Sequence, residues 1–466
     1  MKRIYLCLAH MSGNEMKYIQ EAFDTNWVVP LGPNVNGFEE DLRHFVTSTE
    51  NAEKTEDTEL LKKRVVALCS GTAAVHLGLI AAGVKAGDEV LVQSFTFCAS
   101  THPITYIGAT PILVDSELDT WNMDPELLEE AIKDRIAKTG KKPKAIVPVY
   151  LYGMPAKLDE IMAIARKYEI PVVEDAAEGL GSRYKGQVCG TFGDYGVLSF
   201  NGNKMITTSG GGALICPNEE MWRRVMFFAT QAREAYPYYQ HEEIGYNYRM
   251  SNICAGIGRG QMTVLEDHIA HHRHIADMYR EAFKDVDGIT FHDECLTPNP
   301  SPEGEGSEKH IPLMKSNFWL STILLDEKLH VKGEENAYAE SVEEAVGGAA
   351  GVVHGGGSVH TDCEPNRNVE ALRIALDAVG IESRPLWKPM HKQPVYCAPL
   401  NDKGEMIIEE LPNGVICQTS ASSVAYINGV SEDLFHKGLC LPSGPCVSDE
   451  DVERIINAIK SNIIGS

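Results

Sequence analysis

The chain has 466 residues, which is long enough for one large domain and a smaller second one. Hydrophobic residues make up 43% and charged residues 23%, values that are typical of globular proteins and not of disordered ones. With 42 basic and 66 acidic residues the formal net charge is −24, which argues against a nucleic-acid-binding surface because phosphate backbones require clustered Lys and Arg.

Targeting segments and metal motifs are not evident in the sequence. The first ten residues contain too short an apolar stretch for a signal peptide, and no run of eighteen apolar residues occurs that would suggest a membrane helix. The twelve cysteines form no Cys-x-x-Cys pair, so neither a zinc ribbon nor a redox motif is indicated. We therefore expect a cytoplasmic protein with reduced thiols, without a metal site and without a membrane or nucleic-acid partner.

Short β-branched runs alternate with helical patterns from about residue 64 to 216. Such alternation predicts an α/β fold with a mostly parallel sheet and helices on both faces. The expected helices cover Ala73–Ala82, Pro125–Ala137 and Lys157–Tyr168. The expected strands are Val65–Leu68, Glu89–Gln93, Thr110–Asp115, Ala145–Tyr150, Pro171–Asp175, Tyr195–Phe200 and Gly211–Cys216.

Two further helical patterns, Glu219–Ala229 and Ser251–Tyr279, lead out of this region. Near the end of the second pattern, His268, His271 and His272 would share one face of the helix, a spacing that resembles a metal site. Since nothing else in the sequence supports a metal there, we favour a solvated helix face.

The pattern changes after residue 280. We expect a loop over Leu296–Lys315, a strand over Phe318–Leu325 and a mobile, glycine-rich surface excursion over Val331–Cys363. A helix over Asn368–Val379, an extended segment over Gly380–Pro385 and a last helix over Ser448–Ile463 follow. The sequence thus predicts a large domain at 1–275 and a smaller α/β domain at 276–466.

Several polar groups follow the ends of predicted strands, which is where ligands bind in such sheets. Lys204 follows the run that ends at Phe200, and Asp175 ends another run. A lysine near a carboxylate and a phosphate-binding serine suits pyridoxal phosphate, because the lysine can form a Schiff base and the aspartate can hold the ring nitrogen protonated. A single lysine is otherwise more often a solvated surface charge.

Two strand-to-helix turns could complete such a site. Ser70 and Gly71 begin a helix whose free N–H groups could bind a phosphate. Phe97 could lie against the face of a cofactor ring, although an ordinary core phenylalanine is at least as frequent in such a position.

Ordered motifs over about four fifths of the chain resemble the DegT/DnrJ/EryC1/StrS family of sugar aminotransferases, which are fold-type-I pyridoxal-phosphate enzymes. The matching stretches are Gly32-Pro33 with Phe38-Glu39, Ser70-Gly71-Thr72-Ala73-Ala74, Ser94-Phe95-Thr96-Phe97, Gly108-Ala109-Thr110-Pro111, Leu151-Tyr152-Gly153, Glu174-Asp175-Ala176-Ala177-Glu178, Gly190-Thr191-Phe192-Gly193-Asp194, Ser199-Phe200-Asn201-Gly202-Asn203-Lys204, Gly245-Tyr246-Asn247-Tyr248-Arg249-Met250 and Arg384-Pro385-Leu386-Trp387-Lys388-Pro389-Met390-His391.

The resemblance implies a role for each matched site residue. Lys204 would carry the Schiff base and shuttle the proton, and Asp175 would pair with the pyridine nitrogen. Phe97 would lie against the ring. The phosphate would be held by residues of two turns and by a neighbouring subunit, which implies a homodimer with shared active sites. These phosphate residues are Ser70, Gly71, Thr72, Ala73 and Ser199, with Asn247 and Arg249 from the other subunit.

Three departures from the family pattern stand out. Glu178 occupies a position where many relatives have glutamine, and a glutamate near the cofactor hydroxyl would have to be protonated or hydrogen-bonded elsewhere. Ser209 to Gly212 lacks the carboxylate of the usual Gly-Glu-Gly-Gly. The stretch 296–365 is longer than the family norm, and it could be a substrate lid or an inert insertion.

The resemblance favours amino transfer, because a dehydratase branch has histidine where this chain has Lys204. The implied substrate is a UDP-linked 4-keto-6-deoxy-N-acetylhexosamine, aminated at C4 with glutamate as donor, for surface glycan synthesis. Candidate residues for the sugar nucleotide are Asn26, Trp27, Trp387, Lys388 and His391. For Trp387 and Lys388 the alternative is a loop that packs on its own domain. An eliminase or dehydratase, and a regulatory protein without turnover, remain the alternative functions.

Overall fold

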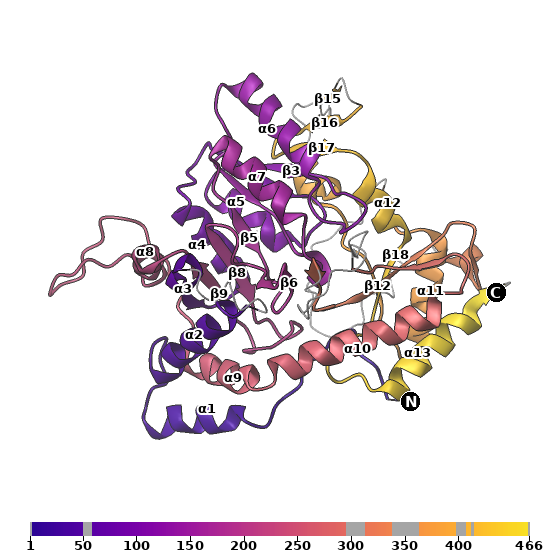
Figure 1. Ribbon diagram of the computed structural model, residues 1–466, viewed down its shortest axis with the longest axis horizontal. Helices are drawn as coiled ribbons and strands as arrows, with labels where there is room; N and C mark the ends of the chain where they lie inside the picture. Colours follow the sequence, from indigo (N-terminus) through magenta and orange to yellow (C-terminus); the bar gives the residue numbers. More distant parts are fainter. Residues whose placement is uncertain are drawn as a thin grey trace, which may run out of the picture.

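The computed structural model describes residues 2–49, 58–294, 313–337, 363–397, 407–411 and 414–464. Figure 1 shows a large part built around a sheet, a second part that lies beside it, and a loop after α8 (Glu219–Ala229) that projects from the body. Among these residues, no helix combines the length and the apolar character that crossing a membrane requires.

Seven strands of the large part form a continuous stretch of its sheet, in the order β3-β2-β4-β5-β8-β9-β1. Bridges from Ile146 to Val172 and from Val149 to Asp175 join its two halves between β4 and β5. All neighbouring strands run parallel except β9, which is antiparallel to β8 and β1. The expected α/β fold with a mostly parallel sheet is confirmed. The strands are β1 (Arg64–Leu68), β2 (Glu89–Gln93), β3 (Thr110–Val114), β4 (Ala145–Val147), β5 (Val173–Asp175), β8 (Tyr195–Ser199) and β9 (Gly212–Cys216).

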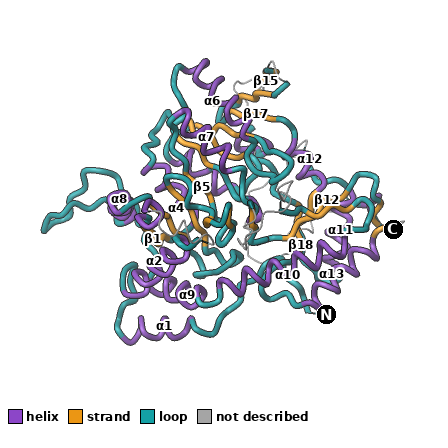
Figure 2. Tube along the Cα trace, in the orientation of Figure 1, coloured by secondary structure: helices purple, strands orange, loops and turns teal. Residues whose placement is uncertain are grey.

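Helices surround this sheet, as Figure 2 shows in purple around the orange strands. The apolar helix α4 (Gly71–Ala81) is buried along nearly its whole length, because Gly78 lets it approach β5 and β9 closely: a Cβ there would lie 3.0 Å from Val173. The other helices of this part are α1 (Glu15–Asp24), α2 (Pro33–Val46), α3 (Thr58–Lys62), α5 (His102–Tyr106), α6 (Pro125–Thr139), α7 (Leu158–Tyr168) and α8.

The helix expected at Ser251–Tyr279 is divided into α9 (Asn252–Met262) and α10 (Leu265–Phe283). The Thr263 hydroxyl donates a hydrogen bond to the Gly260 carbonyl at 2.6 Å, and Val264 has φ −126°, outside the helical range.

The expectation of a solvated histidine face on this helix is wrong. His268 and His272 are 5% and 0% exposed, and their Nδ1 atoms lie 3.1 Å from the Met205 carbonyl and 3.2 Å from the Phe318 carbonyl. Burial lowers the pKa of both rings, that of His272 to about 3. His271 contacts the Val447 carbonyl at 2.9 Å. In the part of the chain that the structure describes, no group of three metal-ligating side chains is placed to hold an ion.

The second part is an antiparallel sheet of order β10-β12-β18-β14 that packs against α10, α11 and α13. The predicted strand, helices and extended segment in this region are confirmed. The elements are β10 (Ile289–Phe291), β12 (Ser321–Leu325), α11 (Arg367–Ala378), β14 (Arg384–Pro385), α12 (Val430–Lys437), β18 (Gly438–Leu441) and α13 (Asp449–Asn462).

Short elements complete the fold. They are β6 (Arg183–Tyr184), β7 (Gln187–Val188), β11 (Met314–Lys315), β13 (His330–Val331) and β19 (Ile463–Ile464), with 3₁₀ helices η2 (Cys98–Ser100), η3 (Leu151–Gly153), η4 (Glu334–Asn336), η5 (Met390–Lys392) and η6 (Pro394–Tyr396). Most of the expected loop at 296–315 and of the glycine-rich stretch at 331–363 lies outside the described residues.

The boundary predicted at 275/276 needs two corrections. β15 (Ile407–Glu410), β16 (Ile416–Thr419) and β17 (Val424–Ile427) extend the large sheet, because β17 pairs in parallel with β3. At the other end, Ile4 pairs with Ile381 and packs in the core of the second part. We propose a division into two parts in which 407–427 belong to the first part and the first residues to the second.

Candidate active site

The carboxyl ends of β1, β5 and β8 meet at one edge of the sheet. Asp175 is the last residue of β5, and Ser199 is the last residue of the adjacent parallel strand β8. Leu68 at the end of β1 and Ser199 both pair with Gly212 on the intervening strand β9. This register brings the turn after β1 beside Ser199 and confirms the expected clustering at the strand ends.

The turn after β1 has the features of a phosphate site. Ser70 caps α4, accepting the Ala73 N–H at 3.0 Å, so the N–H groups of Gly71 and Thr72 in the first helical turn are left for a ligand. A Cβ on Gly71 would lie 2.9 Å from the Ser199 Cβ, so glycine permits the close approach of Ser199. Ala73 itself has its N–H bound to Ser70 in this structure.

The Asp175 carboxylate is buried beneath this edge, with 3% of the residue exposed. Ser100 donates its hydroxyl to Oδ2 at 2.6 Å, and the Ala177 N–H donates to Oδ1 at 3.1 Å. Burial raises the pKa of Asp175, and these two hydrogen bonds oppose the shift. A buried carboxylate without a cation at hydrogen-bond distance suits a ligand that carries a protonated ring nitrogen.

Lys204 is held by two groups. Its Nζ lies 3.2 Å from Glu178 Oε1 and 3.8 Å from the ring centroid of Trp319. The other Glu178 oxygen accepts the Tyr152 N–H at 2.8 Å, which supplies the hydrogen bonding that a buried glutamate requires. Trp319 and Tyr152 were not predicted as site residues: they lie far along the chain from Lys204, and no motif points to Trp319.

Phe97 and Trp387 lie together near the same edge. Phe97 is 53% exposed, so it is not an ordinary core phenylalanine, and its ring centroid is 6.1 Å from that of Trp387. The backbone N–H of Trp387 donates to the Tyr152 hydroxyl at 2.8 Å, and the ring centroids of the two side chains are 5.6 Å apart. Lys388 points its Nζ at the Cys363 carbonyl, 3.0 Å away.

The structure contradicts substrate binding by His391. The side chain is fully buried, with Nδ1 2.6 Å from Ser94 Oγ and Nε2 3.1 Å from Glu432. Burial alone would raise the pKa of Glu432, but hydrogen bonds from His391 and Lys392 lower it to about 2. His391 thus connects the segment that bears Trp387 to Ser94, which directly follows β2, and to Glu432 in α12. Because both of its ring nitrogens are engaged, neither is left to bind a sugar.

Asn26 and Trp27 lie between α1 and α2. Trp27 is 40% exposed, and its carbonyl accepts a hydrogen bond from Asn252 at 2.9 Å. Within the described chain, no hydrogen bond or ring contact joins either residue to Trp387 or His391. The structure therefore does not assemble the five predicted substrate residues into one group in a single subunit.

Arg249 also departs from its predicted role. Its guanidinium forms a buried ion pair with Glu39 and donates to the Ala67 carbonyl at 3.0 Å, so it is engaged within its own chain. Burial raises the pKa of Glu39, and Arg249 opposes that shift. Asn247, by contrast, is exposed beside the base of the projecting loop, where its side chain accepts from Gln231 at 3.0 Å.

Replacement of Arg249 by methionine is expected to lower the free energy of unfolding by about 3 to 5 kcal/mol, because Glu39 would remain as a buried, unpaired carboxylate. Urea unfolding of the cofactor-free chain measures the change. Arg223→Ala, which removes an exposed pair with Glu219, is the matched control and should cost at most about 1 kcal/mol. Equal losses in both variants would contradict a structural role for the Arg249–Glu39 pair.

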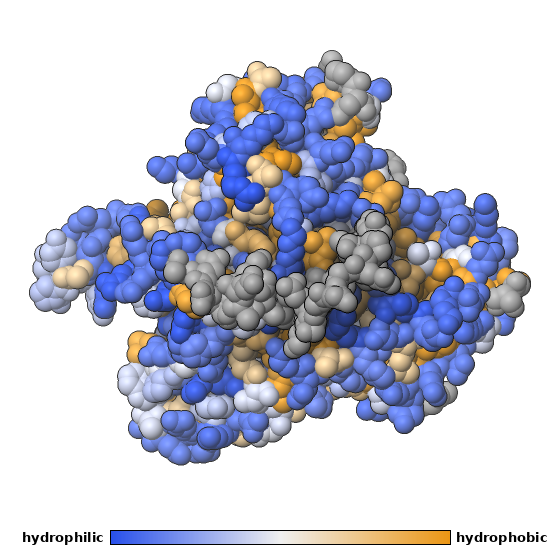
Figure 3. Space-filling view, viewed as in Figure 1, coloured by the Kyte–Doolittle hydropathy of each residue, from blue (hydrophilic) through white to orange (hydrophobic). Residues whose placement is uncertain are grey.

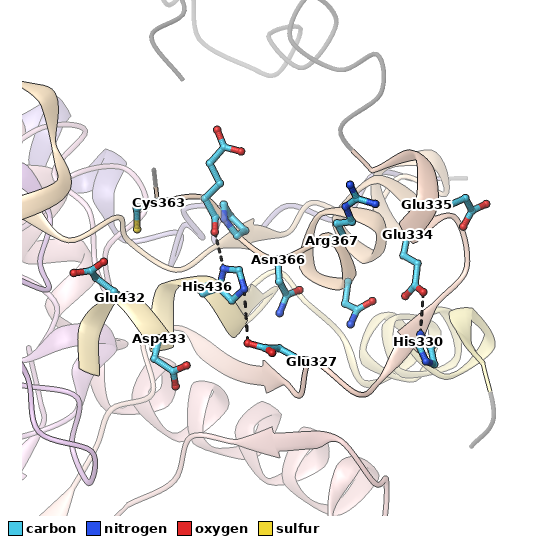
Figure 4. Close-up of a pocket in the computed structure, with 13 residues that line it drawn as sticks. Glu327, His330, Glu334, Glu335, Cys363, Asn366, Arg367, Glu432, Asp433 and His436 are labelled. Atoms are coloured by element: carbon cyan, nitrogen blue, oxygen red, sulfur yellow. Dashed lines mark hydrogen bonds and ion pairs between the residues drawn. The ribbon is translucent and has the colours of Figure 1, made fainter. Parts of the chain in front are cut away.

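A cavity of about 930 Å³ lies elsewhere, in the second part (Figure 4). Neither Lys204 nor Asp175 lines it. Six carboxylates surround it, which makes it unfavourable for a diphosphate. These are Glu327, Glu334, Glu335, Glu364, Glu432 and Asp433. On the face seen in Figure 1, most of the coloured surface is hydrophilic, with separate hydrophobic groups (Figure 3).

The side chains at the sheet edge fit pyridoxal phosphate: a lysine amine, a buried carboxylate for the ring nitrogen, and a helix N-terminus with a serine for the phosphate. Comparison with known proteins agrees. The profile of the DegT/DnrJ/EryC1/StrS aminotransferase family matches residues 10–302.

Three relatives resemble the chain over nearly its whole length. EpsN of Bacillus subtilis, a presumed pyridoxal phosphate-dependent aminotransferase, is 40% identical over 98% of this chain and 95% of its own. GDP-perosamine synthase of Escherichia coli O157:H7 is 30% identical over 98% of each chain. The crystal structure of a DegT DnrJ EryC1 StrS aminotransferase from Brucella abortus has a TM-score of 0.71 and 26% identity, covering 96% of this chain and 95% of that one.

Proposed function

The chain belongs to the DegT/DnrJ/EryC1/StrS aminotransferase family, and we propose that it transfers the amino group of glutamate to C4 of a UDP-linked 4-keto-6-deoxy-N-acetylhexosamine. The chain is a sugar aminotransferase, and pyridoxal phosphate is its cofactor. The observation that carries the proposal is the placement of Lys204 at the same sheet edge as Asp175 and the Gly71 turn. Support for the sugar comes from the segment 384–391, which places Trp387 beside Phe97.

Bound pyridoxal phosphate supplies an aldehyde that receives the amino group and a ring that stores the electron pair released when a C–H bond breaks. Lys204 Nζ would take the proton from the donor's α-carbon and pass it to the carbon that receives the amino group, and in the second half of the reaction it would carry a proton from that carbon to C4 of the sugar. The Asp175 carboxylate would hold the ring nitrogen in its charged form. The N–H groups of Gly71 and Thr72, together with Ser199, would hold the phosphate.

The proposal includes a homodimer with shared active sites. Supporting it, the loop after α8 leaves the body of the molecule (Figure 1), and its aromatic and apolar side chains are exposed: Tyr236 51%, Tyr238 62%, Tyr239 80% and Ile244 83%. Such a projecting apolar surface is typical of a subunit interface. In such a dimer Asn247, which is exposed beside the base of this loop, would reach the phosphate held by the other subunit.

The aminated sugar would enter a surface polysaccharide such as a capsule, and we place its synthesis in the cytoplasm, where nucleotide sugars are made. A GDP-linked sugar is the nearest competing substrate, because one relative carries that nucleotide in its name.

Incubation of the protein with glutamate and the UDP-4-keto sugar is expected to yield 2-oxoglutarate and the amino sugar in equal amounts. NMR of the product identifies the aminated carbon and the face of attack. The GDP-4-keto-6-deoxy sugar serves as the parallel substrate, and a tenfold preference for it would reassign the nucleotide. Loss of sugar without 2-oxoglutarate would indicate elimination. If neither changes, the chain is a binding or regulatory protein.

A further inference from the structure

The amine of Lys204 lies between an anion and an aromatic face. Glu178 Oε1 is 3.2 Å from Nζ, and the Trp319 ring centroid is 3.8 Å from it. The Lys204 side chain is 13% exposed and that of Glu178 5%, so water contributes little to solvation of the ammonium. A carboxylate and an aromatic face are the two kinds of group that stabilise a cation in such surroundings.

Hydrogen bonds fix Trp319 relative to the backbone beside Lys204 and relative to Glu178. Its Nε1–H donates to the carbonyl of Asn203, the residue before Lys204, at 2.7 Å. Its backbone N–H donates to Asn317 Oδ1 at 2.9 Å, and the amide nitrogen of Asn317 donates to the Glu178 carbonyl at 2.9 Å. The ring therefore has a set position relative to Lys204 and to Glu178.

The backbone around Trp319 is strained where it makes these contacts. Phe318 has φ +47°, a left-handed conformation that is rare for a bulky residue. Gly153 has φ +96°, and a Cβ on it would lie 1.8 Å from Asn317 Oδ1, so glycine makes room for Asn317. Strain of this kind concentrates at functional sites, since packing alone seldom requires it.

We propose that Glu178 and Trp319 form a resting site for the Lys204 ammonium, which the lysine occupies whenever it is not joined to the cofactor. The inference rests on the proposed amino transfer, because that reaction frees Lys204 while the cofactor carries the amino group. By then the lysine has passed the donor's α-proton on to the carbon that receives the amino group, and the freed amine takes up a proton from solvent to become an ammonium. The resting site stabilises this cation without breaking or forming a covalent bond, and Trp319 is a positioning residue supplied by the segment that precedes β12.

Competitive labelling with acetic anhydride tests the proposal, because only the neutral amine reacts. The full-length chain is labelled at pH 8, both cofactor-free and with pyridoxamine phosphate bound, and the Lys204 peptide is quantified by mass spectrometry against exposed Lys85. The variants are Trp319→Leu, which removes the aromatic face, Trp319→Phe, which keeps one, and Glu178→Gln, which removes the charge and keeps the shape.

At pH 8 the labelling rate of Lys204 relative to Lys85 is expected to rise about three- to tenfold in Trp319→Leu and at least about tenfold in Glu178→Gln, because each variant removes a group that stabilises the unreactive ammonium. Trp319→Phe should raise the rate by less than Trp319→Leu. Glu178→Gln keeps the shape of the site, so a rise in Trp319→Leu without a rise in Glu178→Gln would show that the ring only restricts access, and this result overturns the resting site. An unchanged rate in Trp319→Leu does the same.

Two checks keep these outcomes interpretable. Thermal unfolding identifies a variant that fails to fold, and Trp319→Phe, which retains most of the ring volume, then provides the measurement in place of Trp319→Leu. Labelling uses neither sugar nor glutamate. A chain that lacks aminotransferase activity but shows the expected changes in labelling rate would overturn the proposed function and leave the resting site in place. A chain that has the activity but lacks these changes would overturn the resting site and leave the proposed function in place.

Discussion

Lys204→Ala protein is expected to lose at least about 10³-fold of the single-turnover rate of 2-oxoglutarate formation, because one side chain supplies both the covalent attachment and the proton transfer. Lys204 follows β8 and reaches the edge where Asp175 lies, and the nearest other titratable group, Glu178, is fixed by the Tyr152 N–H. The visible absorption of the bound cofactor should shift to that of the free aldehyde, which reports loss of attachment independently of turnover.

Lys204→Arg separates charge from proton transfer. Arginine keeps the cation near Glu178 and Trp319, but it does not lose its proton at accessible pH, so the rate should fall as far as in the alanine variant. Lys142→Ala is the matched control, because Lys142 is exposed and donates to the Tyr168 and Glu169 carbonyls far along the sequence from the site. A rate within tenfold of native in either Lys204 variant would contradict the assigned role.

Asp175→Asn is expected to lower turnover by about 10³-fold or more and, in the cofactor-free chain, to raise stability at neutral pH. The loss of rate follows because a neutral amide does not hold the ring nitrogen in its charged form, so the ring stores electrons poorly. The gain in stability follows because the described part of the chain places no cation at hydrogen-bond distance from the buried Asp175 charge, and the attraction of Lys204 offsets the cost of burial only in part, whereas asparagine carries no charge to bury.

The stability effect has a defined pH dependence. Burial raises the pKa of Asp175 in the native chain above its ordinary value of 3.8, so between that value and the raised one the native state binds more protons than the unfolded state. Native stability therefore falls as pH rises through this window, by up to about 1.4 kcal/mol per pH unit from this group. The advantage of Asp175→Asn over native should grow over the same range.

Urea unfolding at a series of pH values measures this effect. Added pyridoxal phosphate should make the unsubstituted protein the more stable of the two, since it binds the cofactor more tightly than Asp175→Asn does. Ser100→Ala is the control, because it removes a hydrogen bond to Asp175 and leaves the charge in place. If Asp175→Asn were less stable than the unsubstituted chain at pH 7 without cofactor, the attraction of Lys204 and the hydrogen bonds to the carboxylate would outweigh the cost of its burial.

The sequence was sufficient for those site residues whose positions follow from strand ends. Asp175, Ser199, Ser70 and Lys204 each stand at or shortly after the carboxyl end of a buried strand, and parallel pairing places such ends at one edge. Regular alternation of hydrophobic runs and helices was therefore enough to predict both the sheet and its ligand edge.

The predicted roles that the structure does not support depend on the direction in which a side chain points. A sequence motif carries no information about that direction. Arg249 and His391 match family motifs, but their partners Glu39 and Glu432 lie 210 and 41 residues away along the chain, and burial of these pairs follows from tertiary packing alone. Trp319 could not be found for the related reason that its contact with Lys204 depends on the left-handed backbone of Phe318.

The three antiparallel strands β15, β16 and β17 have a consequence for where the chain can be truncated. After forming β10, β12 and β14 of the second sheet, the chain returns to the first sheet, where β17 pairs with β3. Only then does it form α12 and β18. A fragment that ends near residue 275 would leave the N–H and C=O groups along β3 without their partner strand, and an open apolar edge of that kind promotes aggregation. We therefore expect a chain truncated near residue 275, or two halves made separately and mixed, to aggregate rather than to form the native fold.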